Sequence, residues 1–322
     1  YGFRPHRNAH QALAKALEYI NSGYQDIVDI DLKSFFDEVS HEKLLTLIYK
    51  KVQCHTALWL LRKFLRSPIS INGKLHKRRK GVPQGSPLSP LLANILLNEL
   101  DKLLEKRGLR YVRYADDFSI YLRSRKAAER VMRNISNFLE NKLQLPINWE
   151  KSGIRRPVNF ELLGHSFVPT YRKGDKGKYQ LVVRKKAWIE LKRKLKWFTR
   201  KTLPMTFDDR MTKIKRLMYG WVAYFARAAI HSKLKKLDEW LRNRLRYCIW
   251  HDWKKPDRKR KNLIRLGVNH DMAYAWSRSR MGGWRIAQSP ILGTTITLHR
   301  LRKRGYISFV DTYHNFRNRK KD

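Results

Sequence analysis

Apolar and polar residues alternate at the period of a β-strand in several short runs of the chain. Two of these runs are rich in Tyr, Val and Ile and are separated by only three residues, which predicts two neighbouring strands joined by a tight turn. An Asn72-Gly73 pair within Ile69–Lys77 predicts a hairpin elsewhere. The other predicted strands or strand-containing segments are Gln25–Asp31, Leu109–Tyr114, Phe118–Leu122, Leu145–Trp149 and Phe160–Pro169.

Other segments repeat their apolar residues every three or four positions, as the buried face of a helix requires. Before residue 170 these segments alternate with strands, which predicts an α+β domain with helices packed on a sheet that has three or more antiparallel strands. After about residue 184 the pattern is helical throughout, with aromatic residues at helical spacing. The predicted helices are His10–Asn21, His41–Lys51, His55–Arg66, Leu91–Arg107, Lys126–Lys142, Lys185–Arg200, Phe207–Ile230 and Ser232–Trp253.

The changes of pattern divide the chain into three predicted domains, 1–170, 171–253 and 254–322. The basic run Lys254–Arg260 contains Pro256 and is predicted to be a linker. The last domain is basic and aromatic, with a less regular period. The opening residues Tyr1-Gly2-Phe3-Arg4-Pro5 resemble the middle of a longer sequence, so we expect upstream sequence to be missing.

Charge changes this picture most. The 322 residues include 71 Lys and Arg against 27 Asp and Glu, a formal net charge of +44, which is far more than solubility needs. Such an excess predicts a large polyanionic partner, and nucleic acid is the first candidate. The chain also has 10 Trp, 15 Tyr and 13 Phe, and a disordered basic tail would lack these aromatic residues. The composition therefore predicts a folded protein with a basic surface.

The two cysteines exclude other classes. Cys54 and Cys248 are far apart and form no CxxC pair, which excludes a zinc ribbon and argues against a disulfide framework. Their scarcity fits a reducing compartment. The chain has neither a visible signal peptide nor an apolar run long enough to span a membrane, so no membrane partner is expected.

Two adjacent carboxylates, Asp116 and Asp117, lie between the two neighbouring predicted strands. An Asp-Asp pair in a turn is common, because Asp accepts turn geometry and bonds the nearby backbone. The second interpretation is a metal site, because Mg²⁺ prefers carboxylate oxygen and would remove the repulsion between the two anions. Asp31, at the end of another predicted strand, favours the metal site as a third carboxylate. Asp29 and Asp37 nearby have ordinary explanations, as a solvated residue and as the start of a helix or turn.

A rigid loop lies between the two acidic stretches. Gly81–Pro90 contains three prolines and two glycines, which excludes helix and central strand. It is either an ordinary entry into the following helix or a loop that presents Gln84 and the backbone of Gly85 to a ligand.

These motifs together resemble those of reverse transcriptases. Tyr114-Ala115-Asp116-Asp117 is similar to the signature of that family, Asp31–Asp37 to its first palm motif, and Gly81–Pro90 to its Pro-Gln-Gly loop. The resemblance extends to group II intron-encoded reverse transcriptases and maturases through Tyr1–Pro5 with His10, and through Leu162–His165. It also includes Phe207–Phe225 and Leu237–Lys254, which resemble the thumb, or maturase domain X, and covers nearly the whole chain.

The resemblance implies a right-hand polymerase palm with partial fingers, then an all-α thumb and a basic C-terminal segment that binds nucleic acid. Asp31, Asp116 and Asp117 would be catalytic and would hold two Mg²⁺ ions, with Mn²⁺ as a substitute. Two such ions lie roughly 3.5–4 Å apart in nucleotidyl transfer. Four further residues would contact nucleotide or template. They are Phe36, which would exclude a 2′-hydroxyl unless it only packs in the core, Gln84, Gly85 and Lys151.

The implied function is that of an RNA-directed DNA polymerase of a group II intron, which also binds intron RNA to promote splicing and mobility. Its expected partners are the intron RNA, an RNA template–DNA primer duplex, target DNA and dNTPs. One alternative is an RNA-binding splicing factor without polymerase activity, and another is a reverse transcriptase recruited to defence or diversification. The fingers motifs and the C-terminal nuclease module of the family are not found in the sequence. Bacterial cytoplasm is the expected location, and an organelle is the other option.

Overall fold

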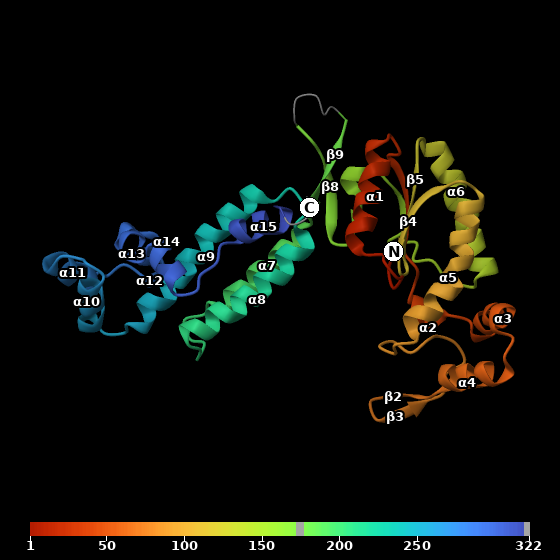
Figure 1. Ribbon diagram of the computed structural model, residues 1–322, viewed down its shortest axis with the longest axis horizontal. Coiled ribbons are helices and arrows are strands. Elements are labelled where there is room, and N and C mark those ends of the chain that lie inside the picture. The colour runs from red at the N-terminus through yellow and green to blue at the C-terminus, as the bar shows by residue number, and fades with distance from the viewer. Residues whose placement is uncertain (172–176, 319–322) are drawn as a thin grey trace. The chain divides into compact units, whose positions relative to one another are not determined.

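The computed structural model describes residues 1–171 and 177–318. The chain forms two compact units, Tyr1–Leu181 (unit 1) and Val182–Asp322 (unit 2), which Figure 1 shows in red to green and green to blue. Unit 1 is mixed α/β and unit 2 is helical in its described part. The three domains expected from the sequence stay a prediction.

A four-stranded sheet forms the centre of unit 1. Its strand order is β4-β5-β1-β6, and every neighbouring pair is antiparallel. The predicted strand Leu145–Trp149 is wrong, because this segment makes only one bridge, between Leu32 and Ile147. The strands of the sheet are β1 (Asp26–Ile30), β4 (Arg110–Tyr114), β5 (Asp117–Leu122) and β6 (Gly153–Arg155).

The two faces of this sheet pack against different helices. In β5, Phe118, Ile120 and Leu122 lie in the same buried cluster as the apolar residues of α5 (Ser89–Lys106) and α6 (Arg125–Asn137). On the opposite face, the Tyr121 ring lies 5.5 Å from the ring of Tyr19 in α1 (Ala9–Asn21). Figure 1 shows α1 on one side of the strands and α5 and α6 on the other. Because successive side chains of β5 point to opposite faces of the sheet, the strand contributes to the buried packing on both faces.

The remaining elements of unit 1 follow the predicted pattern in part, because β9, the 3₁₀ helix and the π-helix at the end of α6 were not predicted. Ser40 accepts a hydrogen bond from the Lys43 backbone N–H and caps α3, as its residue type favours. Gly164 was expected inside a strand but lies with Leu163 in a turn, where both residues have positive φ (74° and 48°), so the segment is a hairpin. These elements are α2 (Phe35–Glu38), α3 (His41–Val52), α4 (His55–Arg66), β2 (Ile69–Ile71), β3 (Lys74–His76), a π-helix (Phe138–Lys142), a 3₁₀ helix (Pro157–Asn159), β7 (Glu161–Leu162), β8 (His165–Pro169) and β9 (Tyr179–Val183).

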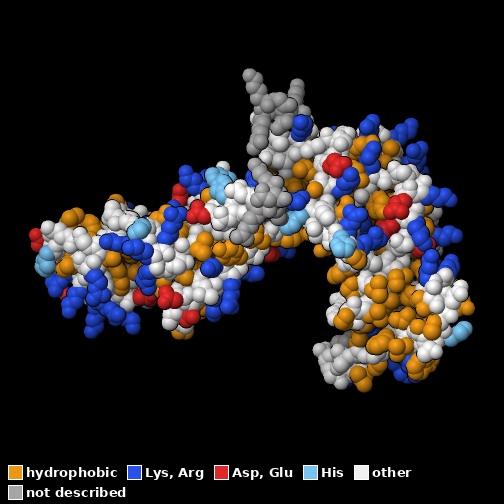
Figure 2. All heavy atoms as spheres, viewed as in Figure 1, with side chains coloured by type: hydrophobic (Ala, Val, Ile, Leu, Met, Phe, Trp, Pro, Cys, Tyr) orange, Lys and Arg blue, Asp and Glu red, His pale blue; other side chains and the backbone are white. Residues whose placement is uncertain are grey.

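Helix α4 leaves much of its apolar surface exposed. Its apolar residues other than Trp59 gather on one side of the helix, and Leu65 is the fully buried one among them. Trp59, Leu60 and Phe64 are about half exposed, at 56%, 49% and 55%. Figure 2 shows orange side chains gathered over the part of unit 1 that carries α2 and α4.

Unit 2 is built on long helices, and its C-terminal part is helical as well. The predicted linker Lys254–Arg260 is wrong from Pro256 onward, because α10 begins there with proline in its first turn, where the missing N–H would have no partner in the helix. No described helix is both long and apolar enough to cross a membrane. The helices are α7 (Lys185–Phe198), α8 (Phe207–Phe225), α9 (His231–Asp252), α10 (Pro256–Arg265), α11 (His270–Ser277), α12 (Gly283–Gln288), α13 (Pro290–Thr295), α14 (Leu298–Lys303) and α15 (Phe309–Asn318).

Asp238 ties the end of the chain to α9. This carboxylate is 2% exposed and accepts hydrogen bonds from the hydroxyls of Tyr306 (2.9 Å) and Ser308 (2.8 Å). It also accepts from the backbone N–H groups of Phe309 (2.9 Å) and Val310 (3.0 Å), at the N-terminus of α15. A negative charge at this end of a helix is favoured by the helix dipole. The C-terminal helix is therefore part of the packed unit.

Candidate active site

The two adjacent carboxylates lie where β4 turns into β5. Ala115 and Asp116 form the two-residue turn, and Asp117 is already the first residue of β5, opposite Tyr114. Ala115 has a φ of +57°, a left-handed conformation that costs a residue with a Cβ atom roughly 1–2 kcal/mol. The hairpin and its acidic tip were expected from the sequence. The left-handed alanine was not.

Strand register brings Asp31 to the same place. In the antiparallel pair of β1 and β5, Ile30 lies opposite Phe118. One residue further on, Asp31 leaves β1 beside Asp117, which opens β5. Because side chains alternate across a strand, Asp29, Asp31 and Asp117 project from the sheet face that does not carry Phe118. Register therefore brings the third predicted carboxylate beside Asp117.

These carboxylates act on one another electrostatically. Partial loss of hydration, although Asp117 still reaches solvent, and then the neighbouring charges of Asp116, Asp31 and Asp29 raise the pKa of Asp117 to about 6. Loss of hydration also raises the pKa of Asp29, and Asp31 adds to this, whereas a hydrogen bond from Arg155 Nε (2.9 Å) acts against it. Asp29 was expected to be simply solvated, and it is instead half-buried and ion-paired.

The donor set has the chemistry of a site for divalent cations. Three carboxylates that repel one another are hard oxygen donors, and a divalent cation would remove the repulsion. In the described residues, however, no three carboxylate, imidazole or thiol groups are gathered closely enough to hold a metal ion. The residues fit a divalent cation in type and charge. They lie near one another but do not form a complete coordination shell.

The segment after the π-helix runs along Asp31 and fixes it. The Asp31 backbone N–H donates to Ser152 Oγ (2.9 Å), and its carbonyl accepts from the Asn148 N–H (2.8 Å). This brings Lys151 to the site, where its Nζ lies 3.8 Å from Asp31 Oδ2 on a side chain that is 70% exposed. The sequence singled out Lys151, but Asn148 and Ser152 carry no recognisable motif.

The predicted Pro-Gln-Gly loop is bonded to the segment that follows β1. The N–H of Val82 donates to the Phe36 carbonyl (2.6 Å), and that of Gly81 donates to the Val39 carbonyl (2.7 Å). A Cβ at Gly81 would lie 2.7 Å from the Asp37 carbonyl oxygen, so this approach requires glycine. Gln84 and Gly85 are exposed at the turn beyond it. Phe36 is half-buried and packs on the core with its ring 5.2 Å from that of Phe35.

Sequence reasoning missed a buried polar group behind the hairpin. Arg113, the last residue but one of β4, donates two hydrogen bonds to Asp101 of α5 (2.8 and 2.5 Å). It donates a third to Asn94 Oδ1 of the same helix (2.9 Å). Asn94 and Asp101 are seven residues apart, which places them on one side of a helix. Two polar residues at this spacing within the apolar stretch of α5 were the available signal.

Both units match known families. Residues 1–167 match the model of the reverse transcriptase (RNA-dependent DNA polymerase) family. Residues 189–267 match the model of the group II intron, maturase-specific domain. The resemblance noted from the motifs is confirmed by these two matches.

Individual proteins are also similar to this chain. Protein YkfC of Escherichia coli (strain K12) is 30% identical over 52% of this chain and 54% of its own length. The group II intron-encoded protein LtrA of Lactococcus lactis subsp. cremoris is 29% identical over 61% of this chain and 41% of its own. Apo telomerase from Candida tropicalis, a solved structure, gives a TM-score of 0.44 at 12% identity over 94% of this chain and 56% of the telomerase chain. The chain thus spans about half the length of the curated relatives it matches.

Proposed function

The chain belongs to the reverse transcriptase family, and we propose on that premise that it is an RNA-directed DNA polymerase of a group II intron. We further propose that it binds the intron RNA to promote splicing and mobility. Unit 1 would be the palm with part of the fingers, and the helices of unit 2 would begin with the thumb, or maturase domain X, which the second family match supports.

One observation carries the polymerase half of the proposal. Asp31, Asp116 and Asp117 come from chain segments 85 residues apart, and strand register sets them at one corner of the sheet. Nothing in folding requires three repelling carboxylates there, and partial loss of hydration, together with their repulsion, raises the pKa of Asp117 to about 6. When bound there, divalent ions would activate the primer 3′-hydroxyl and neutralise the leaving pyrophosphate.

The chain's own residues would do the positioning. Asp31, Asp116 and Asp117 would hold the ions, and Lys151 would place its ammonium beside the phosphates, where a mobile cation is useful. Phe36 and the exposed turn of Gln84 and Gly85 would contact the incoming nucleotide and the template. The excess of basic residues would bind the phosphates of the template–primer duplex, the intron RNA and target DNA. We place this activity in a bacterial cytoplasm.

The second candidate function is an RNA-binding splicing factor that keeps the fold without polymerase activity. The maturase-specific match favours it as much as it favours the first. The two differ in one respect, because only a polymerase has a use for the carboxylate corner.

Primer extension on an RNA template with Mg²⁺ and dNTPs tests the proposal. The samples are this chain and its Asp116→Ala variant. The matched control is Asp271→Ala, an exposed carboxylate of unit 2. We expect Asp116→Ala to lower extension at least about 1,000-fold, because charge neutralisation carries most of phosphoryl transfer, with RNA affinity within a few-fold.

Tight RNA binding with no extension by the wild-type chain would transfer the assignment to the splicing factor. A collapse of RNA affinity in Asp116→Ala, with Asp271→Ala unaffected, would show instead that Asp116 is structural.

A further inference from the structure

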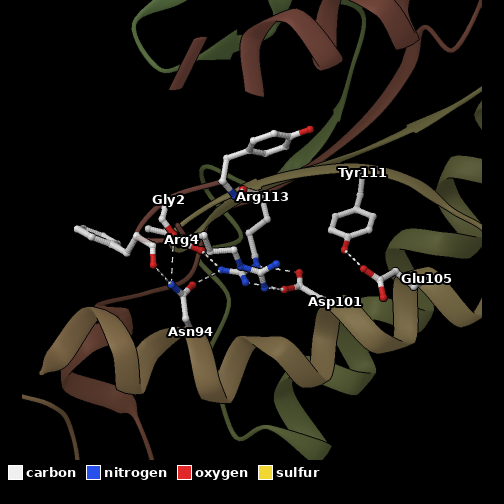
Figure 3. A network of polar contacts seen from close by, with 10 residues as sticks. Gly2, Arg4, Asn94, Asp101, Glu105, Tyr111 and Arg113 are labelled. Atoms are coloured by element: carbon white, nitrogen blue, oxygen red, sulfur yellow. Dashed lines mark hydrogen bonds and ion pairs between the residues drawn. The ribbon is translucent and has the colours of Figure 1, made fainter. Parts of the chain in front are cut away.

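A buried ion pair lies directly behind the turn that carries Asp116 and Asp117. Asp101 and Arg113 are each 3% exposed. Arg113 donates from Nε to Asp101 Oδ1 (2.8 Å) and from Nη2 to Oδ2 (2.5 Å), and Arg4 donates to the same Oδ2 (2.5 Å). Figure 3 shows both guanidinium groups converging on Asp101. The ion pair with Asp101 uses only two of the three side-chain nitrogens of Arg113.

The third nitrogen of Arg113 reaches the turn itself. Its Nη1 donates to the Ala115 carbonyl (2.8 Å) and to Asn94 Oδ1 (2.9 Å). The Asn94 amide in turn donates to the carbonyls of Gly2 and Phe3 (both 3.2 Å). A single planar guanidinium therefore joins α5 to the turn, and Asn94 extends the link to the first residues.

The turn is also held by the first residues of the chain. Gly2 approaches so closely that a Cβ atom there would lie 2.6 Å from the backbone nitrogen of Ala115. Ala115 has a φ of +57°, which it keeps only if its surroundings hold it there. The Arg113 hydrogen bond to its carbonyl and the Gly2 backbone against its nitrogen provide that restraint.

We propose that Arg113, oriented by Asp101, and Gly2 are positioning residues that hold Ala115 in its left-handed conformation and thereby aim Asp116 and Asp117 toward Asp31. The inference rests on the proposed polymerase function. A buried ion pair is in itself weak support for a role in stability. The bond to Ala115 is what links this pair to the acidic turn.

Arg113→Lys tests the role, because lysine keeps a positive charge beside Asp101 but cannot also reach the Ala115 carbonyl in a planar fork. Arg4 still pairs with Asp101 in this variant. Gly2→Ala disturbs the turn at the Ala115 backbone nitrogen without touching a charge. Arg125→Lys is the matched control, since Arg125 pairs with Glu129 (3.1 Å) at an exposed site on α6.

The measurements are kcat and the dNTP KM for primer extension, the Mg²⁺ concentration that gives half-maximal rate, RNA affinity and the folded fraction by circular dichroism. For Arg113→Lys and Gly2→Ala we expect kcat to fall roughly 10- to 100-fold, as misplacement of reacting groups by about 1 Å does. The half-maximal Mg²⁺ concentration should rise several-fold, with RNA affinity within about 3-fold and the control at the wild-type level.

A loss of kcat that matches the loss of folded protein, with the Mg²⁺ response unchanged, would show a merely structural role and overturn the inference. So would wild-type kinetics in both variants while Asp116→Ala is inactive, a result that leaves the polymerase assignment standing. Failure of the polymerase assignment would be seen separately, as an inactive wild type or an active Asp116→Ala.

Discussion

Asp101 in unit 1 and Asp238 in unit 2 are both almost completely buried carboxylates, yet they are satisfied by opposite means. Asp101 is held by the charged groups of Arg113 and Arg4. Asp238 accepts four hydrogen bonds from neutral groups, two hydroxyls and two backbone N–H groups at the start of α15. A guanidinium has nitrogens left over to bind a third segment, whereas hydroxyls and amides complete their bonding at the carboxylate. Asp101 and its arginines therefore connect several segments of unit 1, whereas Asp238 and its neutral partners only fasten the C-terminal helix.

Asp101→Ala is expected to have the largest effect, because it leaves the buried guanidinium of Arg113 without its carboxylate. Breaking a buried ion pair costs about 3–5 kcal/mol. We expect unfolding of unit 1 at a lower denaturant concentration and loss of primer extension beyond the loss of folded protein. Urea denaturation followed by circular dichroism measures the first, and extension at low temperature the second. A change below about 1 kcal/mol would mean that water replaces the carboxylate and that the pair is not buried in solution.

Asp238→Ala should have the next largest effect and a different character. It leaves two hydroxyls and two N–H groups without their acceptor, each costing about 1–3 kcal/mol where it stays dry, and local rearrangement should limit the total to about 2–4 kcal/mol. Proteolysis near α15 should quicken, while the Mg²⁺ response of extension stays at the wild-type level. Asp209→Ala, at an exposed helix start capped by Thr206, is the matched control and should cost about 1 kcal/mol or less. A raised Mg²⁺ requirement in Asp238→Ala would contradict the division of roles.

The smallest predicted effect is a loss of folding stability at acid pH, which arises in unit 1. Burial lowers the pKa of His165 to about 4, against a weaker opposing effect of its hydrogen bond to the Leu163 carbonyl, and burial lowers the pKa of His41 as well. An unfolded histidine binds a proton below its usual pKa of about 6.5 while the folded one does not, so stability is full above that pH and falls as the pH drops toward 4.

We expect this loss to reach about 1–2 kcal/mol near pH 5 for His165, by linkage. Thermal denaturation between pH 4.5 and 7.5 measures it. His165→Gln should flatten the dependence in that range, and the exposed His299→Gln should not. If the stability of all three proteins depended on pH in the same way, the acid response would come from residues other than His165.

The hairpin and its carboxylates could be predicted because their signals are local. The alternating residues around Asp116 and Asp117 set both strands and the turn, and the basic composition indicated a polyanion. Local signals also explain the errors. Pro256 within a basic run was interpreted as a linker, although proline is equally suited to a first helical turn. Leu145–Trp149 has strand-like residues but finds a partner at only one position.

The group of Arg4, Asn94, Asp101 and Arg113 could not be predicted in the same way. Its members come from two elements, α5 and β4, and from the first residues of the chain, and its charged members are unremarkable among 71 basic and 27 acidic residues. The left-handed Ala115 is likewise invisible in a sequence, because alanine favours neither turns nor positive φ. Interactions between distant segments decide both, and only the folded arrangement reveals them.

The strand order β4-β5-β1-β6 also sets the timing of assembly. The β4–β5 hairpin joins residues at most 11 positions apart, from Arg110 to Tyr121, and a hairpin of that kind closes in about 1–10 μs. Pairing of β1 with β5 must instead close a loop of 88 to 96 residues, from Ile30–Phe118 to Asp26–Leu122, and distant pairings are the slow steps of folding. A folding chain would therefore pair β4 with β5 well before Asp31 arrives beside Asp117, and the complete carboxylate corner would be among the last features to appear.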